Sequence, residues 1–166
     1  MTSPLPSNTS GTARLFAGAP GYAVGWQERV IVPSPAVGAQ WSYTVDGRWF
    51  ERLVMARYTF ATSAAAGNRF LAVQLTDTNG LVVTKTQAGE NVAPSNSVNP
   101  WLTIGTPIAA QGPSGDTFGY LPDVIVPPGW VWGSQVFGMD VADAFTGIVL
   151  VVQRFPSDTV AISASG

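Results

Sequence analysis

Apolar and polar residues alternate in short runs along most of the chain, which is typical of half-buried β-strands. The stretch from residue 121 to residue 155 differs, because it ends in a run that is apolar at every position, from Ile148 to Val152. Both faces of such a strand are apolar, so both need cover. We predict that it is the central strand, covered by a facing sheet or by a neighbouring subunit.

Turn residues separate the other predicted strands. Residues 41–45 alternate, and Asp46-Gly47 follows as a two-residue turn, which predicts a hairpin leading into a long strand over residues 48–62. Strict alternation along this strand places Arg52 and Arg57 on opposite faces. The residues predicted to share one of its faces are Val54, Ala56, Tyr58 and Phe60.

A second hairpin is predicted around residues 77–80, Asp-Thr-Asn-Gly, between strands at 69–76 and 81–86. No helical periodicity exceeds one turn. About eight short strands with turns between them predict an all-β fold, a single jelly-roll-like β-sandwich that occupies residues 22–166.

Residues 1–21 are rich in Ser, Thr, Pro, Gly and Ala, and their small apolar anchor is Leu15-Phe16. This composition does not support independent folding, so we predict an extended N-terminal arm that lies on its own domain or on a neighbouring subunit. No signal peptide is visible, and no apolar run approaches the roughly 18 residues of a membrane span. We therefore expect no contact with a membrane.

The chain carries unusually little charge. Only 11% of its residues are charged, against an average of about 25%. A free monomer usually keeps more charge for solubility, whereas a subunit that is covered in an assembly needs less, although a neutral secreted β-protein has a similar composition. Homo-oligomer formation is the favoured interpretation.

The charges are also unevenly distributed. Residues 1–85 contain seven Arg or Lys and four Asp or Glu, a net of +3, and residues 86–166 contain one Arg and six Asp or Glu, a net of −5. This distribution fits ordered contacts between copies, or salt bridges within the fold. No basic cluster is present, so we expect no nucleic-acid partner.

The chain has no histidine and no cysteine. Catalytic triads, thiol nucleophiles and thiolate zinc sites are therefore excluded. Two acidic pairs, Asp140 with Asp143 and Asp116 with Asp123, are the remaining candidates for hydrolysis, and the first pair is also a candidate for Ca²⁺ binding. Both pairs lie beside turns, where aspartate caps backbone N–H groups. We expect turn caps and ion pairs with arginines such as Arg52, and no enzymatic activity, metal or cofactor.

Six tryptophans offer a further interpretation. Trp130 and Trp132 are two residues apart, so they face the same way if both lie in a strand. The pair fits a core wall first, a subunit contact second and a sugar-stacking platform third. The other tryptophans expected in the core are Trp41, Trp49 and Trp101.

The segment LPxxxxPPGW, residues 121–130, is followed by Asp143 and an apolar strand at 146–153. This pattern resembles that of a group of small β-rich virion proteins of tailed bacteriophages. The likeness covers about residues 40–155. The closing strand departs from it, since many relatives have a glutamate where this chain has Gln153-Arg154. Upstream, the matching features are Trp49, Arg52, the Ser/Ala-rich joint at 62–66 and Asn68-Arg69.

The resemblance implies a structural subunit of a phage particle. A capsid decoration (cement) protein is the first expectation, bound to the major capsid protein on the outer surface of the virion, commonly as a trimer. A head–tail connector or tail component is the alternative within this class, and a carbohydrate- or receptor-binding β-module is the alternative outside it. The candidate partner-binding residues are Leu5, Arg14, Leu15, Phe16, Trp130 and Trp132.

Overall fold

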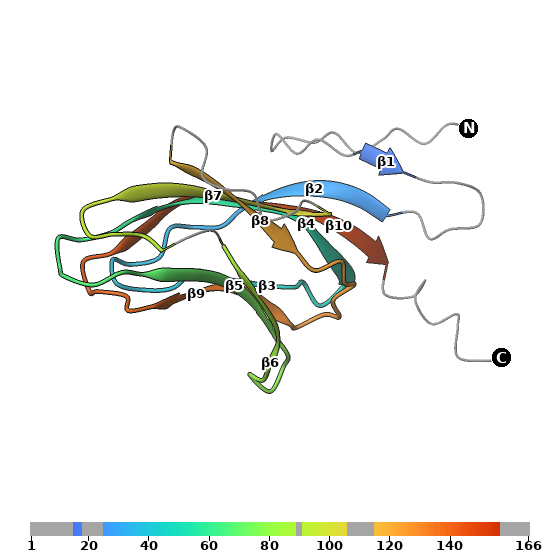
Figure 1. Ribbon diagram of the computed structural model, residues 1–166. Helices are drawn as coiled ribbons and strands as arrows, with labels where there is room; N and C mark the ends of the chain where they lie inside the picture. Colours follow the sequence, from blue (N-terminus) through green and yellow to red (C-terminus); the bar gives the residue numbers. More distant parts are fainter. Residues whose placement is uncertain (1–14, 18–24, 89–90, 106–114, 157–166) are drawn as a thin grey trace, which may run out of the picture.

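The structure is a computed structural model that describes residues 15–17, 25–88, 91–105 and 115–156. These residues form ten β-strands in two sheets that lie one over the other (Figure 1). They contain no helix that could cross a membrane. The strands are β1 (Leu15–Ala17), β2 (Gly25–Ile31), β3 (Ser42–Thr44), β4 (Trp49–Ala61), β5 (Phe70–Thr76), β6 (Val82–Gln87), β7 (Ser97–Ile104), β8 (Asp116–Leu121), β9 (Val131–Phe137) and β10 (Ala144–Pro156).

The strand order is that of a jelly roll with one added strand at each edge of one sheet. The six-stranded sheet runs β1-β2-β10-β4-β7-β8 and the four-stranded sheet runs β3-β9-β5-β6. Without β1 and β8, each sheet has four strands, and most connections cross from one sheet to the other, as in double-sheet jelly rolls. The predicted all-β, jelly-roll-like sandwich is therefore confirmed. Of the ten described strands, β1 falls within the predicted arm.

The apolar run at residues 148–152 forms the middle of β10, which is hydrogen-bonded to β2 on one side and to β4 on the other. Ile148, Leu150 and Val152 are at most 1% exposed and face the other sheet. Val149 and Val151 point to the opposite side and are half-buried. The prediction of a central strand with two apolar faces is confirmed, and the facing sheet covers one of those faces.

Aromatic rings fill the space between the sheets. Tyr58 and Phe60 of β4 point inward, and both contact the ring of Phe145 in β10, at centroid distances of 5.5 and 4.7 Å. Trp41 approaches Tyr58 at 5.8 Å from the other sheet. Edge-on and tilted contacts of this kind add to the stabilisation from burial alone.

A β-bulge in β4 makes the predicted alternation wrong in part. Val151 of β10 pairs with Met55, but the next residue, Val152, pairs with Leu53, so Val54 has no partner in the β10 ladder. Odd-numbered residues of β4 therefore point inward before the bulge and even-numbered residues point inward after it. Val54 does not share the inner face with Ala56. The residues of β4 that are buried are Glu51 and Leu53 before the bulge, and Ala56, Tyr58 and Phe60 after it.

The same bulge places both arginines of β4 on one face. Arg52 alternates with the buried residues before the bulge and Arg57 with those after it, so both point outward. The prediction of opposite faces was wrong because strict alternation takes no account of an inserted residue.

The Asp46-Gly47 turn joins the two sheets rather than the strands of a hairpin. The backbone N–H of Trp49 donates to Asp46 O at 3.1 Å, which closes the turn. However, β3 pairs with β9, and β4 pairs with β10 and β7, so the predicted first hairpin is wrong. The second predicted hairpin, β5 with β6 around residues 77–80, is confirmed.

The PPG segment anchors the entry to β9. Gly129 has φ +82°, a conformation that favours glycine, and its N–H donates to Val45 O at 3.0 Å. The short apolar run before it forms only a bridge, in which the backbones of Val126 and Glu51 exchange hydrogen bonds of 2.7 and 2.9 Å. This segment therefore ties the end of β3 to the start of β4.

Mutations can distinguish how much each face of β10 contributes to the stability of the fold. We expect Leu150→Ala to lower the free energy of unfolding by about 2–5 kcal/mol, because it leaves a cavity in the core. Val149→Ala is the matched control and should cost less than about 1 kcal/mol, because this side chain lies on the outer face. Urea denaturation measures both values. Equal losses would contradict the assignment of the two faces.

Candidate interaction surfaces

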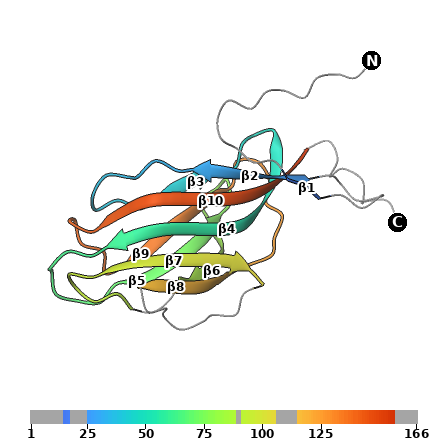
Figure 2. The same ribbon diagram turned by 90° about the horizontal axis from the view of Figure 1, so that it is seen from above.

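The outer face of the six-stranded sheet carries two rows of side chains that cross its strands. Figure 2 looks onto this sheet, in which β2, β10, β4, β7 and β8 lie side by side. The strand registers define the first row, because residues that pair directly point to the same side. This row consists of Ile31, Val149, Arg57, Trp101 and Phe118.

The second row lies two residues further along each strand. It consists of Arg29, Val151, Met55, Thr103 and Tyr120. Seven of the ten positions in the two rows are apolar or aromatic, two are arginine and none is acidic. We call these ten residues the outer apolar face.

The apolar side chains of the outer apolar face are exposed in β2 and β8 and half-buried in the strands between them, at Val149, Val151, Met55 and Trp101. Ile31 is 67% exposed, Tyr120 41% and Phe118 36%. The Arg57 guanidinium lies 4.2 Å from the centre of the Trp101 ring, a cation–π contact that orders both side chains at the surface. A contiguous apolar surface of this kind is characteristic of a protein–protein contact.

The candidate tryptophans do not form an exposed platform. Trp132, in β9, is 1% exposed and belongs to the core. Trp130 precedes β9 and is half-buried against the same core. The first interpretation of this pair, a core wall, is confirmed for Trp132, which leaves that side chain no surface for a partner or a sugar.

The remaining tryptophans are divided between core and surface. Trp41 is 1% exposed, as predicted. Trp49 is half-buried and meets the ring of Trp26 edge-on at 4.6 Å, near the end of the sandwich. Trp101 lies on the outer apolar face, so the prediction that it belongs to the core was wrong.

Only part of the predicted arm lies within the described residues. Leu15 and Phe16 belong to β1, which pairs with β2 through Leu15 with Gln27 and Phe16 with Trp26. This segment therefore extends a sheet of its own chain. Leu5 and Arg14 lie outside the described residues. A role of the arm in binding a partner remains a prediction.

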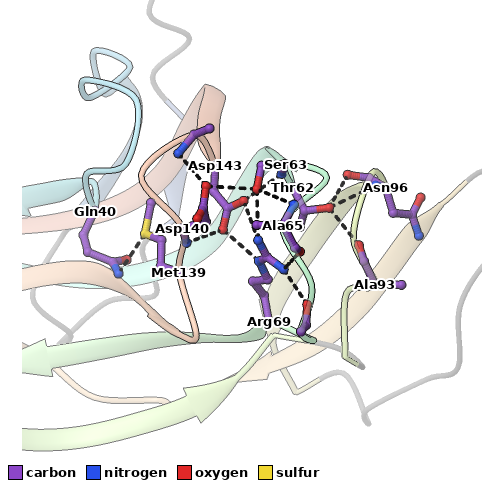
Figure 3. Close-up of polar contacts among 12 residues, drawn as sticks. Gln40, Thr62, Ser63, Ala65, Arg69, Ala93, Asn96, Met139, Asp140 and Asp143 are labelled. Carbon is purple, nitrogen blue, oxygen red and sulfur yellow. Dashed lines mark hydrogen bonds and ion pairs between the residues drawn. The ribbon is translucent and has the colours of Figure 1, made fainter.

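A buried ion pair joins the loops at one end of the sandwich (Figure 3). Asp143 is fully buried and Arg69 is 1% exposed. Arg69 also reaches the loop after β4, where its Nη1 donates to the carbonyl oxygens of Ala65 and Gly67. The four donors to the Asp143 carboxylate are Arg69 Nε (2.9 Å), Arg69 Nη2 (3.2 Å), the backbone N of Ser63 (2.7 Å) and the backbone N of Asp140 (2.8 Å).

Both oxygens of the Asp143 carboxylate accept hydrogen bonds from groups of the same chain. Burial raises the pKa of Asp143, but the hydrogen bonds from Arg69 and from two backbone N–H groups outweigh burial, so the pKa lies below its usual value. Asp140 accepts from Ser63 Oγ at 3.0 Å and from Ala142 N at 3.0 Å. Turn capping and ion pairing, as the sequence suggested, account for both residues.

The other acidic pair is Asp116 with Asp123: Asp116 begins β8, and Asp123 follows that strand. Asp123 forms a two-pronged ion pair with Arg52, with both distances 2.5 Å, so the expected use of Arg52 as an ion-pair partner is confirmed. Within the described residues, no group of three or more acidic, histidine or cysteine side chains is arranged to hold a metal ion.

A second polar network, which sequence analysis missed, lies between the sheets at the end of β10. Arg154 donates to Glu51 at 2.8 Å and to Glu28 at 2.5 Å, and the Tyr43 hydroxyl donates to Glu51 at 2.9 Å. Burial raises the pKa of Glu51, and Arg154 and Tyr43 offset only part of that effect. The arginine at which the chain departs from its phage-protein resemblance is therefore paired within its own fold.

Comparison with known proteins assigns no family. No family model and no curated protein matches the chain. A structure of infectious bursal disease virus, Gx strain, is similar with a TM-score of 0.31 and 13% identity over 99% of this chain and 49% of that one. A structure of the Gt strain of the same virus is similar with a TM-score of 0.29 and 11% identity, over 90% of this chain and 38% of that one. The chain thus spans half or less of the length of these viral chains.

A different kind of protein gives a comparable score. The C-terminal family 22 carbohydrate-binding module of Clostridium thermocellum Xyn10B has a TM-score of 0.24 and 14% identity, over 90% of this chain and 84% of that one. Scores this low do not separate the two kinds of protein, so the fold assignment rests on the strand order of the chain itself.

The buried ion pair should control acid stability. We expect Asp143→Asn to lower the free energy of unfolding by about 3–5 kcal/mol at neutral pH, because it leaves Arg69 buried and unpaired. The folded pKa of Asp143 is depressed, so the contribution of this carboxylate is complete above the unfolded pKa and is lost as the pH falls towards the folded pKa. The difference between wild type and variant should therefore shrink in acid, as measured by urea denaturation across pH.

Asp123→Asn is the control for this prediction, because it breaks an exposed pair and should cost less than about 1 kcal/mol. The pKa of Glu51 is raised, so its contribution to the free energy of unfolding changes with pH in the opposite direction. This contribution is the same in wild type and variant and cancels in their difference. A loss for Asp143→Asn that does not change with pH would contradict the assignment.

Proposed function

We propose that this chain is a structural protein of a virion, and specifically a decoration protein that binds the major capsid protein lattice of a tailed bacteriophage. The observation that carries the proposal is the outer apolar face, on which Ile31, Phe118 and Tyr120 are exposed. The low charge of the sequence and its resemblance to phage virion proteins support the same class.

The composition of the outer apolar face suits a stable contact. It contains Trp101, Tyr120 and Arg57, and these three residue types are the most frequent hot spots of protein interfaces. Burial of apolar area contributes about 25 cal/mol per Å², and each copy bound to a repeating lattice adds the same contribution. Such a protein stabilises a shell by burial and needs no catalytic group.

The position of β1 fits this arrangement. It lies at the edge of the same six-stranded sheet, beyond β2. We infer that the arm and this face contact neighbouring subunits on one side of the body. The two arginines of the face, Arg29 and Arg57, favour a neutral or acidic partner surface. A trimer placed at a symmetry axis is the proposed oligomer.

A head–tail connector or tail protein would use the same kind of surface. The copy number and position of the chain in its particle distinguish these proteins, since a decoration protein covers the capsid surface and a connector occupies one vertex. Electron cryomicroscopy of the particle gives both quantities.

The outer apolar face can be tested with one phenylalanine from each sheet. We expect Phe118→Ala to weaken rebinding to capsids that lack this protein by about tenfold or more, because Phe118 ends the first row of the face. Phe137→Ala is the matched control, since Phe137 is similarly exposed but lies on the other sheet. Cosedimentation with capsids measures binding. Normal binding by Phe118→Ala, or failure of the wild type to bind and stabilise capsids against heat, would refute the proposal.

Deletion of residues 1–20 tests the arm separately. We expect the body to fold, because β1 adds three residues to a sheet edge and the core lies elsewhere, and we expect capsid binding to weaken. Circular dichroism and cosedimentation measure the two outcomes. An unfolded truncated protein would instead make the arm part of the core.

A further inference from the structure

The outer face of the four-stranded sheet differs in chemistry from the outer apolar face. Its centre has small residues, because Ala72 pairs with Gln135, and Gly133 pairs with Gln74. A Cβ at Gly133 would lie 3.0 Å from Trp41 O, so the close approach of β3 favours glycine there. Small residues surrounded by longer side chains produce a hollow on the surface of the sheet.

This hollow contains two adjacent cavities along β5 and β9. The first, of about 530 Å³, is lined by Phe70, Ala72, Lys85, Gln87 and Phe137, together with Leu71. The second, of about 440 Å³, lies over Gly133 and includes Gln74 and Gln135 in its lining. Both volumes are in the range of small-molecule binding sites. We call the two cavities together the amide groove.

Two amide oxygens of the amide groove lack hydrogen-bond partners among the described residues. The Oε1 atoms of Gln74 and Gln135 are buried, and no group in the described part of the chain donates to them. An unpaired buried acceptor costs about 1–3 kcal/mol, so a ligand that supplies a donor would recover this energy. The terminal torsion of glutamine is broad, and rotation about it can turn either oxygen towards the cavity.

Aromatic rings lie at the other end of the groove. Phe70 and Phe137 pair across β5 and β9 and are 45% and 49% exposed. The Lys85 ammonium lies 4.8 Å from the centre of the Phe137 ring. Lys85 is the single lysine of the chain, and no carboxylate is among the lining residues of either cavity.

We propose that the amide groove binds a neutral saccharide chain. A hydroxyl group both donates and accepts, and it therefore matches a glutamine amide, which also does both. The apolar face of a sugar ring matches an exposed phenylalanine. A single lysine provides too little positive charge for nucleic acid, and a lining without carboxylates does not attract cations. This site is independent of the proposed capsid contact, because it lies on the opposite sheet.

Affinity electrophoresis tests the proposal with full-length protein in gels that contain one soluble neutral polysaccharide each: xyloglucan, arabinoxylan, galactomannan, mixed-linkage β-glucan or dextran. We expect at least one to retard the protein. Gln135→Ala and Phe137→Ala should each weaken that binding by about tenfold, because each removes one recognition element. Gln27→Ala, on the outer face of the six-stranded sheet, is the matched control and should leave binding unchanged.

The single lysine locates the site. Reductive methylation with ¹³C-formaldehyde labels Lys85 and keeps its positive charge. The labelled lysine gives one NMR signal, and the chain's terminal amine gives a separate one. Oligosaccharides of the retained polysaccharide should shift this signal in wild type and in Phe118→Ala. If no polysaccharide retards the protein, if both groove variants bind normally or if the Lys85 signal does not move, the proposal is overturned. None of these results tests the proposed capsid contact, which lies on the other sheet.

Discussion

The structure depends on one strand that needs cover on both of its faces. β10 is paired along both edges, so its backbone is satisfied within the sheet, and its inner residues, Ile148, Leu150 and Val152, complete the core. Its outer residues, Val149 and Val151, lie in the middle of the outer apolar face. The fold thus supplies one of the two covers that the sequence demands. The outer side chains of β10 are left half-buried, and this is the physical ground for the proposal that another subunit covers them.

Much of the fold is predictable from the sequence, because alternation and turn residues report directly on strands. The central strand, the β5–β6 hairpin and the jelly-roll class follow from such local patterns. The errors have physical causes. Val54 is an inserted residue that changes the parity of β4, and a bulge leaves no mark in a run of apolar residues. The Asp46-Gly47 turn satisfies hairpin chemistry but joins two sheets, and the choice between these depends on strands distant in sequence.

The candidate surfaces were less accessible to sequence analysis than the core. Trp101 looks like a core residue on hydrophobicity alone, and only the registers of five strands place it beside Arg57 and Phe118. Arg69 and Asp143 are charged residues that a sequence pattern assigns to the surface, yet their hydrogen bonds are satisfied in the interior. In the four-stranded sheet, Gly133 was the available signal, because an isolated glycine in a strand marks a close approach.

The order of strands in the six-stranded sheet has a consequence for folding. β10 is synthesised after the other nine described strands but occupies the middle of the sheet, so β2 and β4 have no common neighbour until it is made. Contacts between segments so far apart in sequence form slowly. The two rows of the outer apolar face are interrupted until β10 is inserted, because Val149 and Val151 bridge their two halves. A nascent chain therefore cannot present the complete outer apolar face, which exists only once β10 has been inserted.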